Sequence, residues 1–216
     1  MPLLNPVKNI FVLKTNDFSC NSYLIKGKTN ALIDSGSASC IPEHISMLKE
    51  LNLVPEDIDL VLHTHGHYDH FQADKIYVNA KNLMSEFDAT HLAEENPEFT
   101  RTRNKSFYPK ISSFLKENQL IKLNDFNLKV IFSLGHTKGS VCFFEPDKKF
   151  LFSGDTIFCH TIGRTDLMSG SFEEIKNSVK KLSELETEFL FPGHGNLVLG
   201  KKENKENFAF IKKNFF

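Results

Sequence analysis

The stretch from His63 to His70 reads HTHGHYDH and holds four histidines and one aspartate within eight residues. It follows the apolar run Leu60-Val61-Leu62 directly, which predicts a buried strand that presents the cluster at its carboxyl end. Imidazole and carboxylate groups are ligands that borderline first-row metals prefer, and this density brings several lone pairs to one point. The stretch therefore predicts a metal site.

Three further candidate ligands also come directly after apolar runs. His136 follows KVIFSLG, Asp155 follows FLFSG and His194 follows EFLFPG. We therefore expect four strand ends to meet at one rim. Two bridged cations ~3.5–4 Å apart can hold a hydroxide between them and stabilise the oxyanion formed when it attacks a carbonyl. The donor set thus indicates hydrolysis without a protein nucleophile.

The motifs THGHYDH, GHTKGS, SGDT and PGHG occur in this order over nearly the whole chain, and in them the sequence resembles the metallo-β-lactamase superfamily. The IGRTD stretch at Ile162 to Asp166, the PGHG motif and the KENFAF tail resemble the small glyoxalase II-like (hydroxyacylglutathione hydrolase-like) hydrolases. The resemblance implies an α+β fold layered as a four-layer αββα sandwich, with two mixed β-sheets flanked by helices. It also implies a single domain over residues 1–216.

The resemblance further implies a dinuclear site with two divalent metal ions, zinc first and iron or manganese as alternatives. By resemblance, one ion binds His65, His67 and His136, the other binds Asp69, His70 and His194, and Asp155 bridges both. The expected reaction is attack of a metal-bound hydroxide on a small thioester or ester. Asp69 and Asp155 are the predicted catalytic residues, and Asp69 is also expected to manage the proton.

Three residues are candidates for supporting roles. Asp34, in LIDSG, is predicted to accept a hydrogen bond from a ligating imidazole, with a simple turn aspartate as the alternative. His160 and Arg164 follow the bridging aspartate closely enough to reach the mouth of the site and hold an anionic substrate group. For Arg164, a bracing pair with Asp166 is an equally good interpretation.

The remaining histidines receive other predictions. His63 precedes the ligand motif and is interpreted as a packed or ligand-supporting residue. His44 and His91 fall in predicted helices and are expected at the surface.

The spacing of apolar residues predicts that a group of strands followed by a helix occurs twice along the chain. The predicted strands are a meander over Asn9 to Asp34, Leu60 to Leu62, Lys75 to Asn79, Asn82 to Ser85, the runs LIKL, FNLKVIFS, VCFFE and FLFSGD, and Glu188 to Phe191. The predicted helices begin at Pro42, at Glu86 (to Glu95), after a Ser171 cap and in the tail from Lys201. This pattern predicts two similar halves.

Two alternative functions remain open. A mononuclear iron persulfide dioxygenase shares the GRTD stretch and, by resemblance, would use His65, His136 and Asp155. The presence of a complete second set of metal ligands, Asp69, His70 and His194, favours the hydrolase over the dioxygenase. The other alternative is a non-enzymatic metal-binding module. True glyoxalase II also carries a longer C-terminal helical domain that helps to bind glutathione, whereas only a short tail follows His194. Recognition of glutathione is therefore left open.

The composition of the chain limits the classes of binding partner that we expect. The 216 residues carry 26 Lys and Arg against 27 Asp and Glu, so no broad basic field favours nucleic acid. No apolar run approaches the ~20 residues that span a bilayer, so membrane insertion is not expected. Four scattered cysteines and the absence of a secretory leader predict a reduced, cytoplasmic protein. The expected partner is a small-molecule substrate, and the oligomeric state is not predicted.

Overall fold

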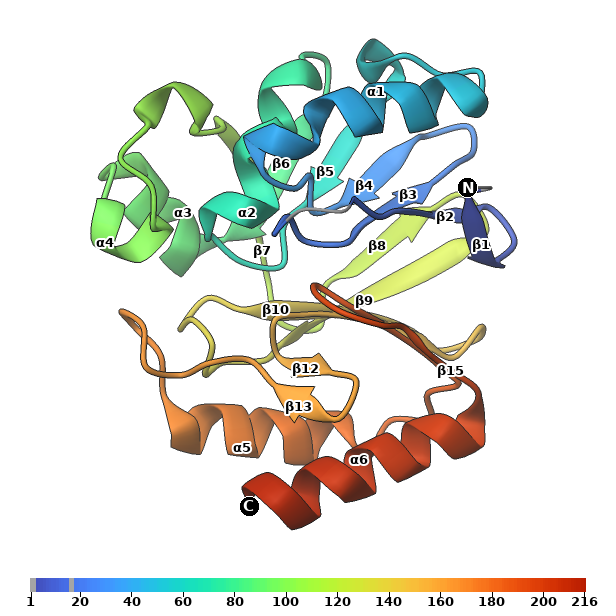
Figure 1. The fold of residues 1–216 in the computed structure, drawn as a ribbon, viewed down its shortest axis with the longest axis vertical. Helices are drawn as coiled ribbons and strands as arrows, with labels where there is room; N and C mark the ends of the chain where they lie inside the picture. Colours follow the sequence, from blue (N-terminus) through green and yellow to red (C-terminus); the bar gives the residue numbers. More distant parts are fainter. Residues whose placement is uncertain (1–2, 16–17) are drawn as a thin grey trace. The chain divides into compact units, whose positions relative to one another are not determined.

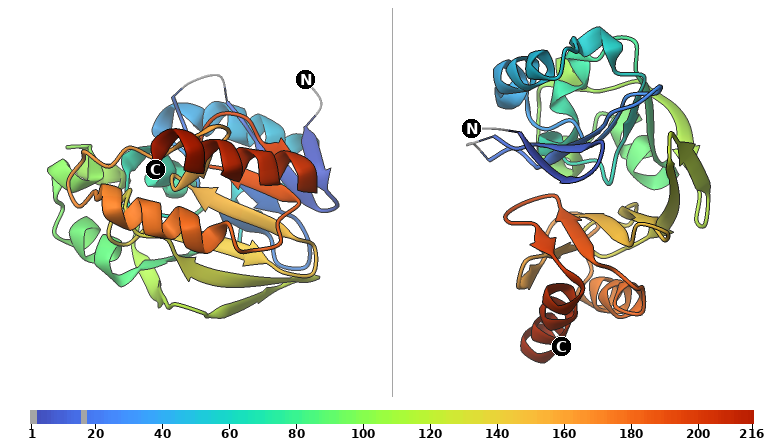
Figure 2. Two further views of the ribbon diagram at one scale, coloured as in Figure 1. Left: turned by 90° about the horizontal axis from the view of Figure 1, so that it is seen from below. Right: turned by 90° about the vertical axis from the view of Figure 1, so that its right-hand side faces the viewer.

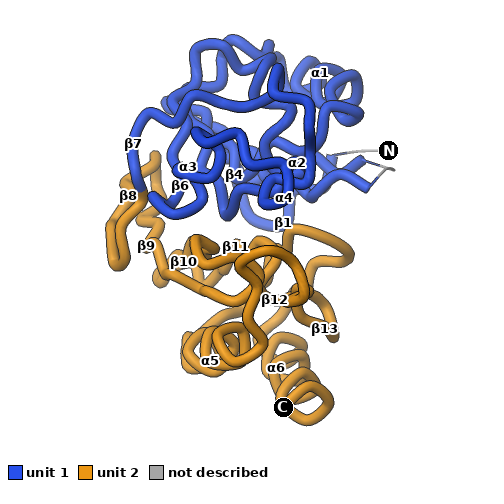
Figure 3. The backbone as a smooth tube through the Cα atoms, turned by 90° about the vertical axis from the view of Figure 1, so that its left-hand side faces the viewer, with its two compact units in different colours: residues 1–114 blue, residues 115–216 orange. Residues whose placement is uncertain are grey.

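The computed structural model describes residues 3–15 and 18–216. The chain divides into two compact units, unit 1 over Met1–Phe114 and unit 2 over Leu115–Phe216 (Figure 3). Each unit holds one large sheet with its own helices. The predicted α+β class, with two mixed sheets flanked by helices, is confirmed. The single domain over residues 1–216 stays a prediction.

Unit 1 holds a seven-stranded sheet in the order β1-β2-β3-β4-β5-β6-β7. Its strands β4, β5 and β6 run parallel and β1 to β4 antiparallel. The strands are β1 (Leu4–Val7), β2 (Ile10–Leu13), β3 (Ser22–Ile25), β4 (Ala31–Ile33), β5 (Leu60–Leu62), β6 (Lys81–Ser85) and β7 (Ile111–Leu115). The helices are α1 (Ile41–Glu50), α2 (Tyr68–Phe71), α3 (Glu86–Ala93) and α4 (Pro97–Thr100), with 3-10 turns η1 (Ala38–Cys40), η2 (Pro55–Asp57), η3 (Gln72–Ile76) and η4 (Lys105–Phe107).

Unit 2 holds a six-stranded sheet in the order β15-β14-β11-β10-β9-β8 and a separate two-stranded hairpin, β12-β13. The pair β11 and β14 is parallel, and the other pairs are antiparallel. The strands are β8 (Leu120–Leu123), β9 (Phe126–Phe132), β10 (Val141–Glu145), β11 (Phe150–Gly154), β12 (Ile157–Phe158), β13 (Thr161–Ile162), β14 (Phe189–Pro192) and β15 (Val198–Leu199). The helices are α5 (Phe172–Leu182) and α6 (Lys201–Phe215).

Each sheet buries one face against helices of its own unit. In unit 1, Leu48 of α1 packs with Leu32 and Val61 of the central strands. In unit 2, Val179 of α5 and Ile211 of α6 belong to one cluster with residues of β9, β10, β11, β14 and β15. Figures 1 and 2 show α5 and α6 on the same face of this sheet. Apolar packing of sheet against helices stabilises each unit, so the strand ends from which the loops begin are fixed in position within that unit.

Several predicted elements are confirmed. Ser171 caps α5, because its Oγ accepts a hydrogen bond from the backbone N–H of Glu174 at 3.3 Å. The tail from Lys201 is helical, and β8 to β11 match the second predicted meander. None of the helices within residues 3–15 and 18–216 has the length and apolar character that crossing a bilayer would need.

Other predictions are wrong. The strand expected over Lys75 to Asn79 is the end of η3 followed by a turn, because Tyr77 and Ala80 donate backbone hydrogen bonds to residues three positions earlier. His44, expected at the surface, is fully buried, and its Nδ1 lies 2.9 Å from the Tyr77 hydroxyl. The predicted strands do not include β1, β7, β12, β13 and β15, and three of these have only two residues, too few to show a period.

Candidate metal centre

In unit 1, the predicted ligands follow the carboxyl end of β5, beside the end of its parallel neighbour β4. The backbone N–H of Asp34, directly after β4, donates to the carbonyl of Leu62 at 3.0 Å. The pairing brings Asp34 next to Thr64 and the histidine loop. Polar side chains of two strand ends therefore meet at one sheet edge, as expected for parallel strands.

The Asp34 carboxylate holds this edge together. Its Oδ1 accepts from the backbone N–H of Thr64 at 2.7 Å, and its Oδ2 accepts from the Thr64 hydroxyl at 2.7 Å and from His70 Nδ1 at 2.8 Å. All three residues are at most 2% exposed. A proton on His70 Nδ1 leaves the Nε2 lone pair as the metal-binding position. This geometry fits the supporting role predicted for Asp34.

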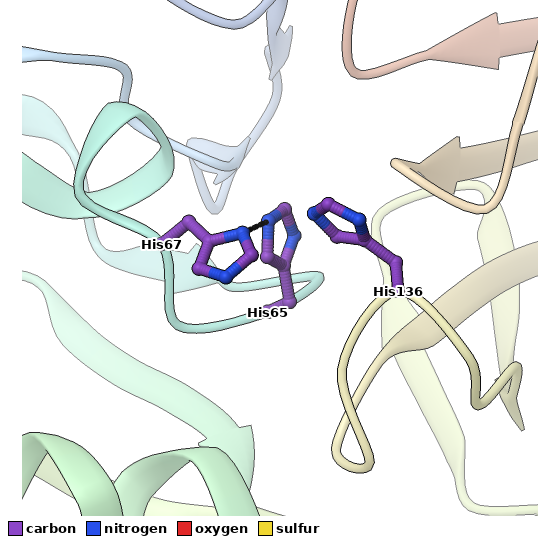
Figure 4. A group of neighbouring side chains, drawn as sticks. All are labelled: His65, His67 and His136. Carbon is purple, nitrogen blue, oxygen red and sulfur yellow. Dashed lines mark hydrogen bonds between the residues drawn. The ribbon is translucent and has the colours of Figure 1, made fainter. Parts of the chain in front are cut away.

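His65 and His67 present nitrogens to each other. His65 Nε2 and His67 Nδ1 are 3.1 Å apart, and both residues are nearly fully buried. Two nitrogens bound to one tetrahedral zinc ion at ~2.0–2.1 Å are separated by roughly 3.3 Å. The pair therefore fits a shared ion. Figure 4 shows both rings on the loop that follows β5, and His136 on the loop that follows β9.

The other predicted residues of this unit lie on or beside the same loop. The ring centroids of His65 and His70 are 4.0 Å apart, and Asp69 lies on α2 next to His70, half-buried. His63 stays apart from them. Its Nε2 lies 3.0 Å from Asp74 Oδ2, with both side chains buried. Burial opposes a charge on His63, but the Asp74 carboxylate outweighs it, and the pKa of His63 is raised.

Two residues near this loop escaped the sequence interpretation. Asp88, fully buried on α3, accepts a hydrogen bond from the Gly66 backbone N–H at 2.8 Å through Oδ2. The Sγ atom of Cys20, a carboxylate oxygen of Asp34 and a ring nitrogen of His70 all lie within 4.8 Å of one another. Neither has a pattern that marks it: Asp88 is one of several acidic residues of a predicted helix, and Cys20 belongs to no cysteine motif. Both contacts arise only in the folded unit.

In unit 2, Asp155 and His194 follow the parallel strands β11 and β14, whose ends pair Gly154 with Pro192. Asp155 Oδ2 lies 3.5 Å from His136 Nε2 and 3.6 Å from His194 Nε2. These separations exceed a normal hydrogen bond of about 2.7–3.2 Å. They are close to the roughly 3–3.4 Å between two ligands of one ion. One carboxylate oxygen of Asp155 thus faces Nε2 of both His136 and His194.

The loop that carries His136 is fixed from two sides. Gly135 has φ +129, and a Cβ there would lie 2.2 Å from the backbone nitrogen of Ile175 in α5, so only glycine fits. His136 Nδ1 donates to the Arg164 carbonyl at 2.8 Å, which assigns the Nε2 lone pair to the side facing Asp155. The supporting acceptor of His136 is therefore a main-chain atom.

The two predicted residues at the mouth have other contacts. The Arg164 guanidinium donates from Nε and Nη2 to both oxygens of Asp166, at 2.8 and 2.7 Å, which is the bracing pair that the sequence left open. The His160 ring lies 4.8 Å from the Phe210 ring of α6. Their roles in binding substrate remain predictions.

Comparison with known proteins adds a family to this geometry. A model of the metallo-β-lactamase superfamily matches residues 15–194. A probable metallo-hydrolase of Methanocaldococcus jannaschii is 34% identical over 197 residues, 86% of this chain and 93% of that protein. The hydroxyacylglutathione hydrolase GloC of Haemophilus influenzae is 30% identical over 210 residues, 92% and 96% of the two chains. The crystal structure of a metallo-β-lactamase family protein from Thermus thermophilus matches with a TM-score of 0.81 at 18% identity, over 94% of this chain and 78% of that one.

Proposed function

The chain belongs to the metallo-β-lactamase superfamily as a metal-dependent hydrolase, and we propose that it cleaves a small thioester or ester at a dinuclear centre. The observation that carries the proposal is the position of Asp155, whose Oδ2 faces Nε2 of both His136 and His194. A relative named hydroxyacylglutathione hydrolase supports the thioester class.

We propose that His65, His67 and His136 hold one divalent ion, that Asp69, His70 and His194 hold the other, and that both share Asp155. Zinc is the first candidate, and iron and manganese accept the same donors. When bound, such a pair lowers the pKa of water and polarises a carbonyl.

The chain's own residues prepare the donors. Asp34 accepts a hydrogen bond from His70 Nδ1–H, and the Arg164 carbonyl accepts one from His136 Nδ1–H, so each neutral ring offers its Nε2 lone pair to a metal. Asp69, the half-buried carboxylate of α2, is the proposed proton acceptor during attack on the substrate. His65, His67 and His136 are each at most 3% exposed, so bulk water has little access to their side chains.

The test is replacement of Asp155 by Ala and by Asn, with measurement of bound metal and of thioester hydrolysis. Both variants are expected to lose metal and at least ~100-fold in turnover, because the shared ligand is removed. Asp125→Ala, an exposed aspartate of the same unit, is the matched control. Unaltered turnover in metal-free Asp155→Ala would refute the mechanism.

The same preparation separates the hydrolase from the dioxygenase alternative. A persulfide dioxygenase would consume oxygen with glutathione persulfide and would leave thioesters intact. The presence of Asp69, His70 and His194 in addition to the three ligands of a mononuclear site supports the hydrolase. Oxygen consumption without hydrolysis would reverse this order.

A further inference from the structure

The hairpin β12-β13 of unit 2 is too small to be stable alone. Its strands have two residues each, and they pair Ile157 with Ile162 and Phe158 with Thr161. His160 in its turn has φ +60, a left-handed conformation that is uncommon outside glycine. Even longer isolated hairpins are marginal in water. Something outside the hairpin must therefore hold its shape.

The segment from the hairpin to Arg164 touches all three predicted ligands of unit 2. The Arg164 carbonyl accepts from His136 Nδ1 at 2.8 Å. The Phe158 ring meets the His194 ring nearly edge to face, at 6.1 Å between centroids. A Cβ on Gly163 would lie 1.8 Å from the Asp155 carbonyl oxygen, so the two backbones are in direct contact. A shift of the hairpin would displace all these contacts together.

Asn207 of α6 binds the hairpin at two points, the last residue of β12 and the turn that follows it. Its Oδ1 accepts from the His160 backbone N–H at 2.6 Å, and its Nδ2 donates to the Phe158 carbonyl at 3.0 Å. The side chain is fully buried. A side-chain amide offers one acceptor oxygen beside a donor group, so a single Asn satisfies both backbone groups. The ring contact between Phe210 and His160 adds a second attachment from the same helix.

We propose that Asn207 is a positioning residue for the metal centre, fixing the β12-β13 hairpin so that the backbone and ring contacts to His136, Asp155 and His194 are kept. This inference deepens the proposed function and rests on it. Without Asn207, the Phe158 carbonyl and the His160 N–H would lose their buried partners and the hairpin would shift. The metal ligands would then keep their identity but lose their geometry.

Asn204 provides a matched control on the same helix. It is also buried, and its Nδ2 lies 3.4 Å from the Val198 carbonyl and 3.3 Å from the Gly200 carbonyl. These contacts fasten the start of α6 to the preceding strand and do not involve the hairpin. Replacing either asparagine by Ala removes a buried amide, so both variants are expected to lower the melting temperature of the metal-free protein.

The experiment measures Co²⁺ affinity of metal-free protein by competition with a chelator, together with the visible spectrum of the Co²⁺ form. Asn207→Ala is expected to bind Co²⁺ about 10–100-fold more weakly and to alter its ligand-field bands, the usual range for loss of a group that orients a ligand. Asn204→Ala is expected to stay within about threefold of wild type, with an unchanged spectrum. If Asn207→Ala does not fold, Asn207→Asp and Asn204→Asp replace the pair, because Asp keeps the acceptor for His160.

Equal affinity and identical spectra in the two variants would overturn the positioning role while leaving the proposed hydrolase intact. Failure of the wild-type protein to bind Co²⁺ at all would instead overturn the proposed metal centre, and the positioning role with it. The comparison of wild type with variants therefore distinguishes the two failures.

Discussion

The two units support their candidate ligands in different ways. In unit 1 the candidate ligands lie on the loop after β5 and on α2, and they are supported by buried carboxylates, Asp34 on His70 and Asp88 on the Gly66 backbone. In unit 2 the ligands come from three separate strand ends and are backed by main-chain contacts, the Arg164 carbonyl on His136 and the backbone beside Gly163 on Asp155. We therefore expect mutations to act by removing side-chain acceptors in unit 1 and by disturbing the fit of the backbone in unit 2.

The largest effect is expected in unit 1, from Asp34→Ala. The change leaves the Thr64 N–H, the Thr64 hydroxyl and His70 Nδ1 buried without their acceptor, and should lower the free energy of unfolding by ~3–5 kcal/mol. Urea denaturation of the metal-free protein measures it. Asp59→Ala removes an exposed acceptor of one backbone bond in the same unit and should cost under ~1 kcal/mol. Equal losses in the two variants would contradict the special role of Asp34.

The second-largest effect is expected in unit 2, where the backbone at Gly163 lies in close contact with the backbone at Asp155. Gly163→Ala places a Cβ against the Asp155 carbonyl and should cost roughly 2–3 kcal/mol. Gly195→Ala is the control, because it has φ +78 but nothing within 4 Å of the added Cβ, and should cost about 1 kcal/mol. Denaturation of both variants gives the comparison. A larger loss at Gly195 than at Gly163 would show that close approach of the backbone is not what matters.

Alkaline pH is expected to destabilise the protein through its buried thiols, one of which, Cys142, lies in the core of unit 2. Burial raises the pKa of Cys142 from 9.0 to about 11. The unfolded chain therefore releases this proton first, so stability is constant below pH ~9 and falls as pH rises towards 11. Cys142 should account for about 2 kcal/mol between pH 8 and 10.5. Unfolding free energies at both pH values, for wild type and Cys142→Ala, test this, and an equal fall in the two proteins would exclude the thiol as the cause.

The smallest effect concerns charge on Asp88. Asp88→Asn can keep a side-chain oxygen as acceptor for the Gly66 N–H but exchanges a charge-assisted hydrogen bond for a neutral one, at a cost of about 1 kcal/mol. Asp88→Ala should cost more, since the buried N–H then has no acceptor there. Thermal unfolding of the two variants is the measurement. If Asn destabilises as much as Ala, the carboxylate charge and not the acceptor position would dominate.

The sequence was sufficient for much of the fold and for the choice of candidate ligands. The sequence predicts four of the candidate ligands because each follows an apolar strand, and strand ends are where a sheet presents polar groups. These residues are His65, His136, Asp155 and His194. The long elements α5 and β9 could be predicted because the spacing of their apolar residues repeats over several helical turns or strand pairs.

The supporting contacts could not be predicted, for physical reasons. The acceptor for His136 is the Arg164 carbonyl, and a main-chain atom leaves no trace in residue type. His44 is buried because it meets the Tyr77 hydroxyl, a partner that only the packed unit supplies. Asn207 lies in the KENFAF stretch, but its residue type does not reveal the two-residue strands that it binds.

The most direct test of the dinuclear centre is the metal-to-protein ratio of freshly purified protein, measured with turnover of a panel of thioesters, lactones and persulfides before and after chelation. We expect about two ions per chain, hydrolysis of a thioester or ester that disappears on chelation, and recovery when divalent metal is returned. Hydrolysis that continues at full rate in protein stripped of metal would contradict this expectation.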